Sequence, residues 1–152
     1  MFDLKHLESF RESNRLEAKK ALGGLPKSIW ETYSAFANAF GGIILLGVEE
    51  YSDRSLHAVD LPDPEGMIDE FLRMVNDPHI ASKNILSDDD IRIECIEGKR
   101  IIVIAVPSAQ RRDRPVYVGG DLYHGSYYRE GDGDYRLTRD EVDMMLRGAE
   151  ET

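Results

Sequence analysis

The chain contains a single cysteine, Cys95, among 152 residues. One thiol excludes an internal disulfide and a zinc ribbon, because both need at least two cysteines. No apolar run is long enough to span a membrane, and the N-terminal MFDLKHLESF lacks the apolar core of a signal peptide. The four histidines show no HxH or HExxH spacing, and no G-x-x-x-x-G-K-[ST] loop is present. These absences predict a cytoplasmic protein without a membrane segment, folded as a single domain over residues 1–152.

Positive charge is also scarce, because 29 acids face 19 bases and give a net charge of −10. Such a balance argues against binding to a polyanion. The acids are unevenly placed, however: residues 49–97 hold 14 acids and 4 bases, which leaves 29 − 14 = 15 acids and 19 − 4 = 15 bases elsewhere. The flanking segments can therefore still present a positive surface to nucleic acid, while the acidic segment 49–97 is a candidate surface for a protein partner.

Hydrophobic periodicity predicts an α+β fold, with helices packed on a mixed, mostly antiparallel sheet. Glycine and proline mark the boundaries, and Thr138 with Glu141 forms a capping box before the last helix. Cys95 is expected to be a small buried side chain within a strand. Helices are predicted near 4–11, 26–40, 65–75 and after 138. Strands are predicted at 15–20 and 43–48, in a hairpin over 91–106 that turns at 97–98, and within 121–130. A short edge strand is predicted to follow the basic loop in QRRDRPVYV, and GDGD at 131–134 is predicted to be a turn.

Two stretches carry carboxylates in positions that could meet. In ESNRLEAKK, Glu17 and Lys19 share one face of the predicted strand, and Glu12 precedes that strand. The strand over 43–48 is expected to deliver Glu49 and Glu50 to one edge of the sheet, with their side chains on opposite faces. Two carboxylates joined by a third form a hard-oxygen site suited to Mg²⁺ or Mn²⁺, with a lysine placed to neutralise a phosphate.

Each stretch also has a purely structural interpretation. A glutamate and a lysine two residues apart are common on a solvated strand, and paired acids often mark the point where a core strand reaches water. Asn38, at the end of the predicted second helix, is expected to cap helix carbonyls or to hold the Glu49–Glu50 strand by hydrogen bonds.

In chain order, ESNRLEAKK, YSAFANAFGGIILLGVEE, GKRIIVIAVP and YYREGDGDYRLT resemble the Schlafen-like family, with its Schlafen/AlbA-type domain, over about residues 10–146. The resemblance implies a mixed α/β fold used in nucleic-acid transactions. In the Schlafen branch it implies a metal-dependent endoribonuclease that acts on structured RNA such as tRNA through three carboxylates. Glu12, Glu17 and Lys19 match that motif, and the third acid falls at Glu49 or Glu50, where the family more often has aspartate.

Basic residues near these motifs are candidates for contact with nucleic acid, because guanidinium and ammonium groups bind phosphates and neighbouring tyrosines can stack on bases. These candidates are Lys19, Lys20, Arg111, Arg112, Arg114 and Arg129.

Three functions remain open from the sequence. The first is a nucleic-acid-binding domain with a Mg²⁺- or Mn²⁺-dependent ribonuclease site. The second is a non-catalytic DNA-binding or transcription-regulatory module, which the resemblance implies for many bacterial members. The third is a protein-interaction domain that uses the acidic segment. Whether the partner is RNA or DNA, and whether the chain forms a homo-oligomer, is also open.

Overall fold

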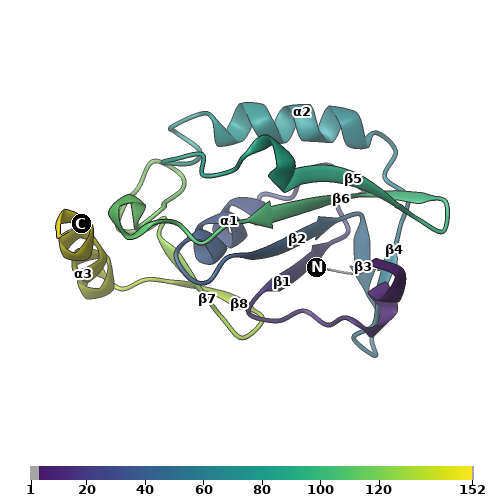
Figure 1. Ribbon diagram of the computed structural model, residues 1–152, viewed down its shortest axis with the longest axis horizontal. Helices are drawn as coiled ribbons and strands as arrows, with labels where there is room; N and C mark the ends of the chain where they lie inside the picture. Colours follow the sequence, from purple (N-terminus) through teal and green to yellow (C-terminus); the bar gives the residue numbers. More distant parts are fainter. Residues whose placement is uncertain (1–3, 152) are drawn as a thin grey trace.

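A four-stranded sheet forms the centre of the computed structural model, which describes residues 4–151 (Figure 1). The strand order is β1 (Leu16–Lys19), β2 (Gly42–Leu46), β6 (Lys99–Val106) and β5 (Ile91–Ile96). β1 and β2 are parallel, whereas β2–β6 and β5–β6 are antiparallel. The predicted α+β class with a mixed, mostly antiparallel sheet is therefore confirmed.

Two helices cover one face of this sheet: α1 (Ile29–Ala37) and α2 (Pro64–Val75). Every residue of α1 except Glu31 is buried, so this helix is a core element. Trp30 of α1 stacks on Phe71 of α2 with ring centroids 5.0 Å apart, which joins the two helices. Ile44 and Ile104 line the facing surface of the sheet.

The opposite face carries a smaller apolar cluster. A 3₁₀ helix, η1 (Leu4–Ser9), and the short strands β3 (Val48–Glu50) and β4 (Leu56–Ala58) cover this face. Among the described residues, no helix is long and apolar enough to cross a membrane.

The strand expected to run to Val48 instead ends at Leu46. Gly47 adopts φ +87°, a conformation that side-chain-bearing residues rarely adopt, and a Cβ there would lie 2.7 Å from Cγ of Leu61. The chain therefore turns at Gly47 and begins β3, which pairs with β4 rather than with the main sheet. As a result, Glu49 and Glu50 belong to a separate two-stranded sheet and do not end a core strand.

The C-terminal third adds a hairpin and a peripheral helix. β7 (Tyr127–Glu130) and β8 (Gly133–Arg136) pack as a hairpin against α1, so part of the predicted GDGD turn is a strand. The capping box of Thr138 and Glu141 begins α3 (Arg139–Glu150) as predicted. Two further 3₁₀ helices are η2 (Asp88–Asp90) and η3 (Arg111–Asp113).

Two smaller expectations are wrong. The edge strand predicted after the basic loop is reduced to isolated bridges at Tyr117 and Val118. Cys95 is exposed rather than buried, because β5 is an edge strand and this residue lies near the end of its hairpin.

Candidate functional site

The outer edge of β1 is closed by residues of the ESNRLEAKK stretch. The backbone N–H of Ser13 donates to the carbonyl of Leu16 at 3.0 Å, and the Leu16 N–H donates back to Ser13 at 3.4 Å. Oε2 of Glu12 accepts the backbone N–H of Ala18 at 2.9 Å. Unpaired backbone groups on an edge strand invite pairing with another chain, so Glu12 and Ser13 protect this edge.

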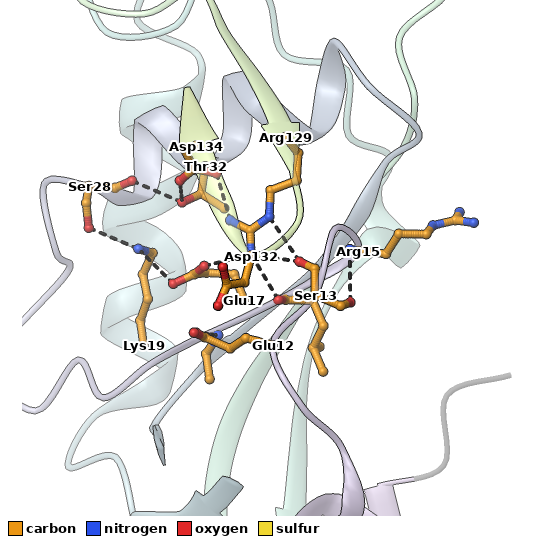
Figure 2. Close-up of polar contacts among 12 residues, drawn as sticks. Glu12, Ser13, Arg15, Glu17, Lys19, Ser28, Thr32, Arg129, Asp132 and Asp134 are labelled. Carbon is orange, nitrogen blue, oxygen red and sulfur yellow. Dashed lines mark hydrogen bonds and ion pairs between the residues drawn. The ribbon is translucent and has the colours of Figure 1, made fainter. Parts of the chain in front are cut away.

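Arg129 of β7 is the centre of the cluster beside this edge (Figure 2). Its side chain is 0% exposed, and its Nη2 lies 2.9 Å from Oε1 of Glu17 while its Nη1 lies 2.7 Å from Oδ1 of Asp134. The guanidinium also donates to the carbonyls of Ser13, at 2.9 and 3.1 Å, and of Leu16, at 3.1 Å. Its planar fork thereby joins β1, β7 and β8 in one arrangement.

This burial overturns the expectation that Arg129 binds nucleic acid. A guanidinium with no exposed surface, ion-paired to two carboxylates, has no access to a phosphate backbone. The Phe36 ring, 4.9 Å from its central carbon, closes the remaining side. The charge of Arg129 therefore stabilises the carboxylate cluster instead.

Lys19 and Glu17 lie on the same face of β1, as the alternation predicted. Nζ of Lys19 is 3.6 Å from Oε2 of Glu17 and donates to Oγ of Ser28, just before α1, at 3.0 Å. Only 11% of the Lys19 side chain is exposed. Both Glu17 oxygens therefore face a cation, Arg129 on one side and Lys19 on the other.

Glu12 is the carboxylate with a strongly shifted proton affinity. The pKa of Glu12 is raised from its ordinary 4.5 to about 7. Burial is the largest cause, the Ala18 N–H opposes it, and the Glu17 carboxyl and the charge of Glu50 add smaller increases. Glu12 therefore lies beside the Glu17 carboxyl and gains or loses its own proton near neutral pH.

The two acids of β3 behave differently. The charge of Glu50 acts on Glu12, whereas Oε2 of Glu49 lies 3.7 Å from Nζ of the exposed Lys20. Glu50 is therefore the acid of this pair that interacts with the β1 cluster, the charged group beside β1 formed by Glu12, Glu17, Lys19, Arg129 and Asp134. Glu49 is turned toward Lys20.

The donor set limits how a metal ion could bind. Within residues 4–151, no three His, Cys, Asp or Glu side chains are grouped so as to hold a metal, so the predicted group of three carboxylates is not assembled. Glu12 and Glu17 do fit the sparser set typical of Mg²⁺, in which one or two carboxylates are completed by water and substrate phosphate.

The remaining basic candidates lie near the opposite end of α1. Arg114 follows η3 and donates to the carbonyls of Ala39 and Ala109 at 2.8 and 3.0 Å. Arg111 is exposed and lies 3.6 Å from Glu151, and Arg112 is exposed on the same 3₁₀ turn. The structure therefore separates this group from Lys19, which meets the start of α1 at Ser28.

Asn38 has the structural role expected of it, although with other partners. Its Oδ1 accepts the backbone N–H of Val116 at 2.7 Å, and its Nδ2 donates to the carbonyls of Val116 and Tyr127 at 3.0 and 2.9 Å. This buried amide ties α1 to the segment that leads into β7, and β7 carries Arg129.

Sequence reasoning missed Asp134 and Thr32. Asp134 pairs with Arg129 and accepts the Thr32 hydroxyl at 2.6 Å, which links β8 to α1. The signal is present in the YYREGDGDYRLT motif, but the turn predicted at 131–134 includes Asp134, which lies in β8.

The comparisons with known proteins agree with this fold. The family model described as Schlafen, AlbA_2 matches residues 12–138. The N-terminal domain of a protein from Nitrosomonas europaea, related to the ATP-dependent DNA helicase RecG, is 29% identical with a TM-score of 0.66, and the match covers 91% of this chain and 95% of that domain. The DIP2311 protein of Corynebacterium diphtheriae is 17% identical with a TM-score of 0.57; 88% of this chain matches 27% of that protein, which supports the fold alone. No curated protein matches the chain.

Proposed function

The chain belongs to the Schlafen, AlbA_2 family, and from this premise we propose that it is a nucleic-acid-binding domain. The observation that carries the proposal is the family match over residues 12–138, which includes the whole β1 cluster. The similar N-terminal domain from a protein related to a DNA helicase supports the same assignment.

The distribution of charge favours one end of the molecule for this contact. The acidic segment 49–97 forms β3, β4, α2, η2 and β5, and among these β3 and β4 lie at the end of the molecule opposite to α3 (Figure 1). The segment reaches η3 through the basic Lys83, which pairs with Asp113. Arg111 and Arg112 are exposed on η3, and Arg114 is half-buried beside them. Phosphates are repelled by the acidic elements and attracted by this group of arginines. We therefore place the contact at η3.

Binding to three labelled nucleic acids tests this proposal. Fluorescence anisotropy with tRNA, single-stranded DNA and duplex DNA at low salt is expected to show binding that weakens as salt rises, because phosphate contacts release counterions. Arg112→Glu is expected to weaken binding, while Arg73→Glu makes the same charge change on α2, within the acidic segment, and should alter it little. The absence of binding to all three at low salt would overturn the proposal.

A second candidate is a Mg²⁺- or Mn²⁺-dependent endoribonuclease acting on structured RNA such as tRNA, and the Glu12–Glu17 carboxyl pair beside Lys19 favours it. A divalent ion held by these carboxylates would activate water and stabilise the charge that develops on a phosphate. Glu12 would give up its proton on binding such a cation, since its pKa is about 7. Lys19, fixed by Ser28, would orient Glu17 and offer a positive charge at the edge of the pair.

Cleavage of tRNA with and without Mn²⁺ distinguishes the two candidates. The ribonuclease predicts Mn²⁺-dependent products from the wild-type chain and none from Glu17→Gln. Because Glu17 also pairs with Arg129, circular dichroism must show that this variant is folded. Binding without cleavage in either metal would leave the domain a non-catalytic binding module.

A further inference from the structure

Phe40 is a large aromatic side chain that the fold leaves in solvent. It lies three residues after the end of α1 and is 65% exposed, although it belongs to a strongly apolar stretch. Its neighbours Ala37 and Ala39 are almost completely buried, so the chain turns this one ring outward at the corner where α1 leads into β2. Nothing in the packing of the sheet requires an aromatic ring at this position.

A groove of about 720 Å³ lies beside the ring. It runs across the starts of β1 and β2 and the end of β6, and the Phe40, Phe10, Ile43 and Pro107 side chains give it apolar walls. Asp90 lines it as well, so a negatively charged chain would have to pass on the side away from η2.

Two arginines are anchored on the backbone at this corner. Nη2 of Arg15 donates to the carbonyl of Phe40 itself at 3.1 Å, and Nη2 of Arg114 donates to the carbonyl of Ala39 at 2.8 Å. Figure 2 shows the Arg15 side chain directed away from the carboxylate cluster. A guanidinium carries five N–H donors, so each of these side chains keeps donors for a further acceptor after its backbone contacts are made.

We propose that Phe40 is a stacking platform for an unpaired base, with Arg15 and Arg114 binding the flanking phosphates, so that the domain prefers single-stranded nucleic acid. An exposed ring bordered by cations is the arrangement that single-strand-binding surfaces use, because every base offers a face for stacking and the backbone follows the positive groups. A regular duplex keeps its bases stacked on one another, so their faces are not available to this ring. This inference rests on the proposed nucleic-acid binding and adds the strand state that it selects.

Affinity measurements on exposed substitutions test the stacking. With labelled single-stranded oligonucleotides, Phe40→Ala is expected to weaken binding about 5- to 150-fold, the range that loss of one base–aromatic stack covers, and Phe40→Tyr should retain most of the affinity. Duplex binding should change little in either variant. Leu72→Ala removes another exposed apolar side chain, on α2 within the acidic segment, and should leave both affinities unchanged.

Fluorescence provides a direct readout of stacking. The chain has one tryptophan, Trp30, which is 8% exposed in the core and supplies a constant background. In Phe40→Trp, the new indole should be quenched when single-stranded oligonucleotide is added, with much less quenching by duplex of the same sequence.

The outcomes separate this inference from the function on which it rests. If the wild-type chain binds no nucleic acid, the proposed function is wrong and the stacking site falls with it. If the wild type binds single strands and duplexes equally, and Phe40→Ala binds both as well as the wild type, nucleic-acid binding stands and the stacking site is overturned. Single-strand preference that is lost in Phe40→Ala and kept in Phe40→Tyr supports the inference.

Discussion

Replacing Arg129 by alanine should remove much of the stability of the domain. The guanidinium is 0% exposed and contacts Glu17 and Asp134 at 2.9 and 2.7 Å, so the substitution leaves Asp134 without its cation and Glu17 with Lys19 alone. Breaking a buried ion pair by removing one partner typically costs about 3–5 kcal/mol. The free energy of unfolding of a domain of this size is about 5–15 kcal/mol, so Arg129→Ala is expected to remove a large part of it.

Urea unfolding followed by far-UV circular dichroism at pH 7 measures the loss. The expected decrease in the free energy of unfolding is about 3–5 kcal/mol, with a melting temperature lower by about 6–20 °C. Arg129→Lys should lie between wild type and alanine, because an ammonium keeps the charge but cannot contact β1, β7 and β8 together. Arg112→Ala is the matched control: this arginine is exposed, and its removal should change stability by less than about 0.5 kcal/mol.

A triple substitution separates the stranded charges from the lost packing. Arg129→Met with Glu17→Gln and Asp134→Asn removes the cation and both carboxylates, so it should be more stable than Arg129→Ala alone. If Arg129→Ala unfolds within about 1 kcal/mol of the wild type, the cluster does not stabilise this edge of the sheet and the reasoning is refuted.

Three further predictions follow from the same structure. The pKa of Glu12 is about 7 in the folded protein and 4.5 ordinarily, so its contribution to stability is fully present below about pH 4.5 and is lost as pH rises through 7. Across this range the urea midpoint of the wild type should therefore fall relative to that of Glu12→Gln. Parallel pH profiles of the two proteins would contradict the shift. Asn38→Ala should cost at least about 2 kcal/mol of unfolding free energy, because it leaves the buried N–H of Val116 without its acceptor; a loss under about 0.5 kcal/mol would show that water or backbone replaces the amide. Gly47→Ala should destabilise by more than about 1 kcal/mol in the same assay, through its φ of +87° and the contact with Leu61, and an unchanged midpoint would show that the turn can rearrange.

Local patterns in the sequence were sufficient for most of the sheet and the helices. The 91–106 hairpin, the capped C-terminal helix and the strand carrying Glu17 were each predicted from residues close together in the chain, because turn chemistry, capping and alternation act over a few positions. β3 was not predicted, because Gly47 stands inside one continuous apolar run and only the approach of Leu61 shows that the run breaks there.

The candidate site divides in the same way. Alternation placed Glu17 and Lys19 on one face, and the motif order indicated the family that the comparison confirms. The different environments of Glu49 and Glu50 depend on Lys20 and Glu12, which flank β1 and are distant in sequence, so the sequence left both acids as candidates. The exposure of Phe40 was not predicted, because within an apolar stretch no local pattern shows which aromatic ring faces water.

Sequence alone therefore determined the class of fold, the family and which residues of β1 share a face, since these depend on short-range periodicity and motif order. Tertiary structure decided which side chains and backbone groups those residues contact. Arg129 contacts the carbonyls of Leu16 and Ser13, 113 and 116 residues earlier in the chain, and this long-range contact supplies a buried cation for the carboxylates. The same residue was predicted from the sequence to bind nucleic acid, because a guanidinium is equally suited to a phosphate and to a carboxylate, and only packing determines which of them it reaches.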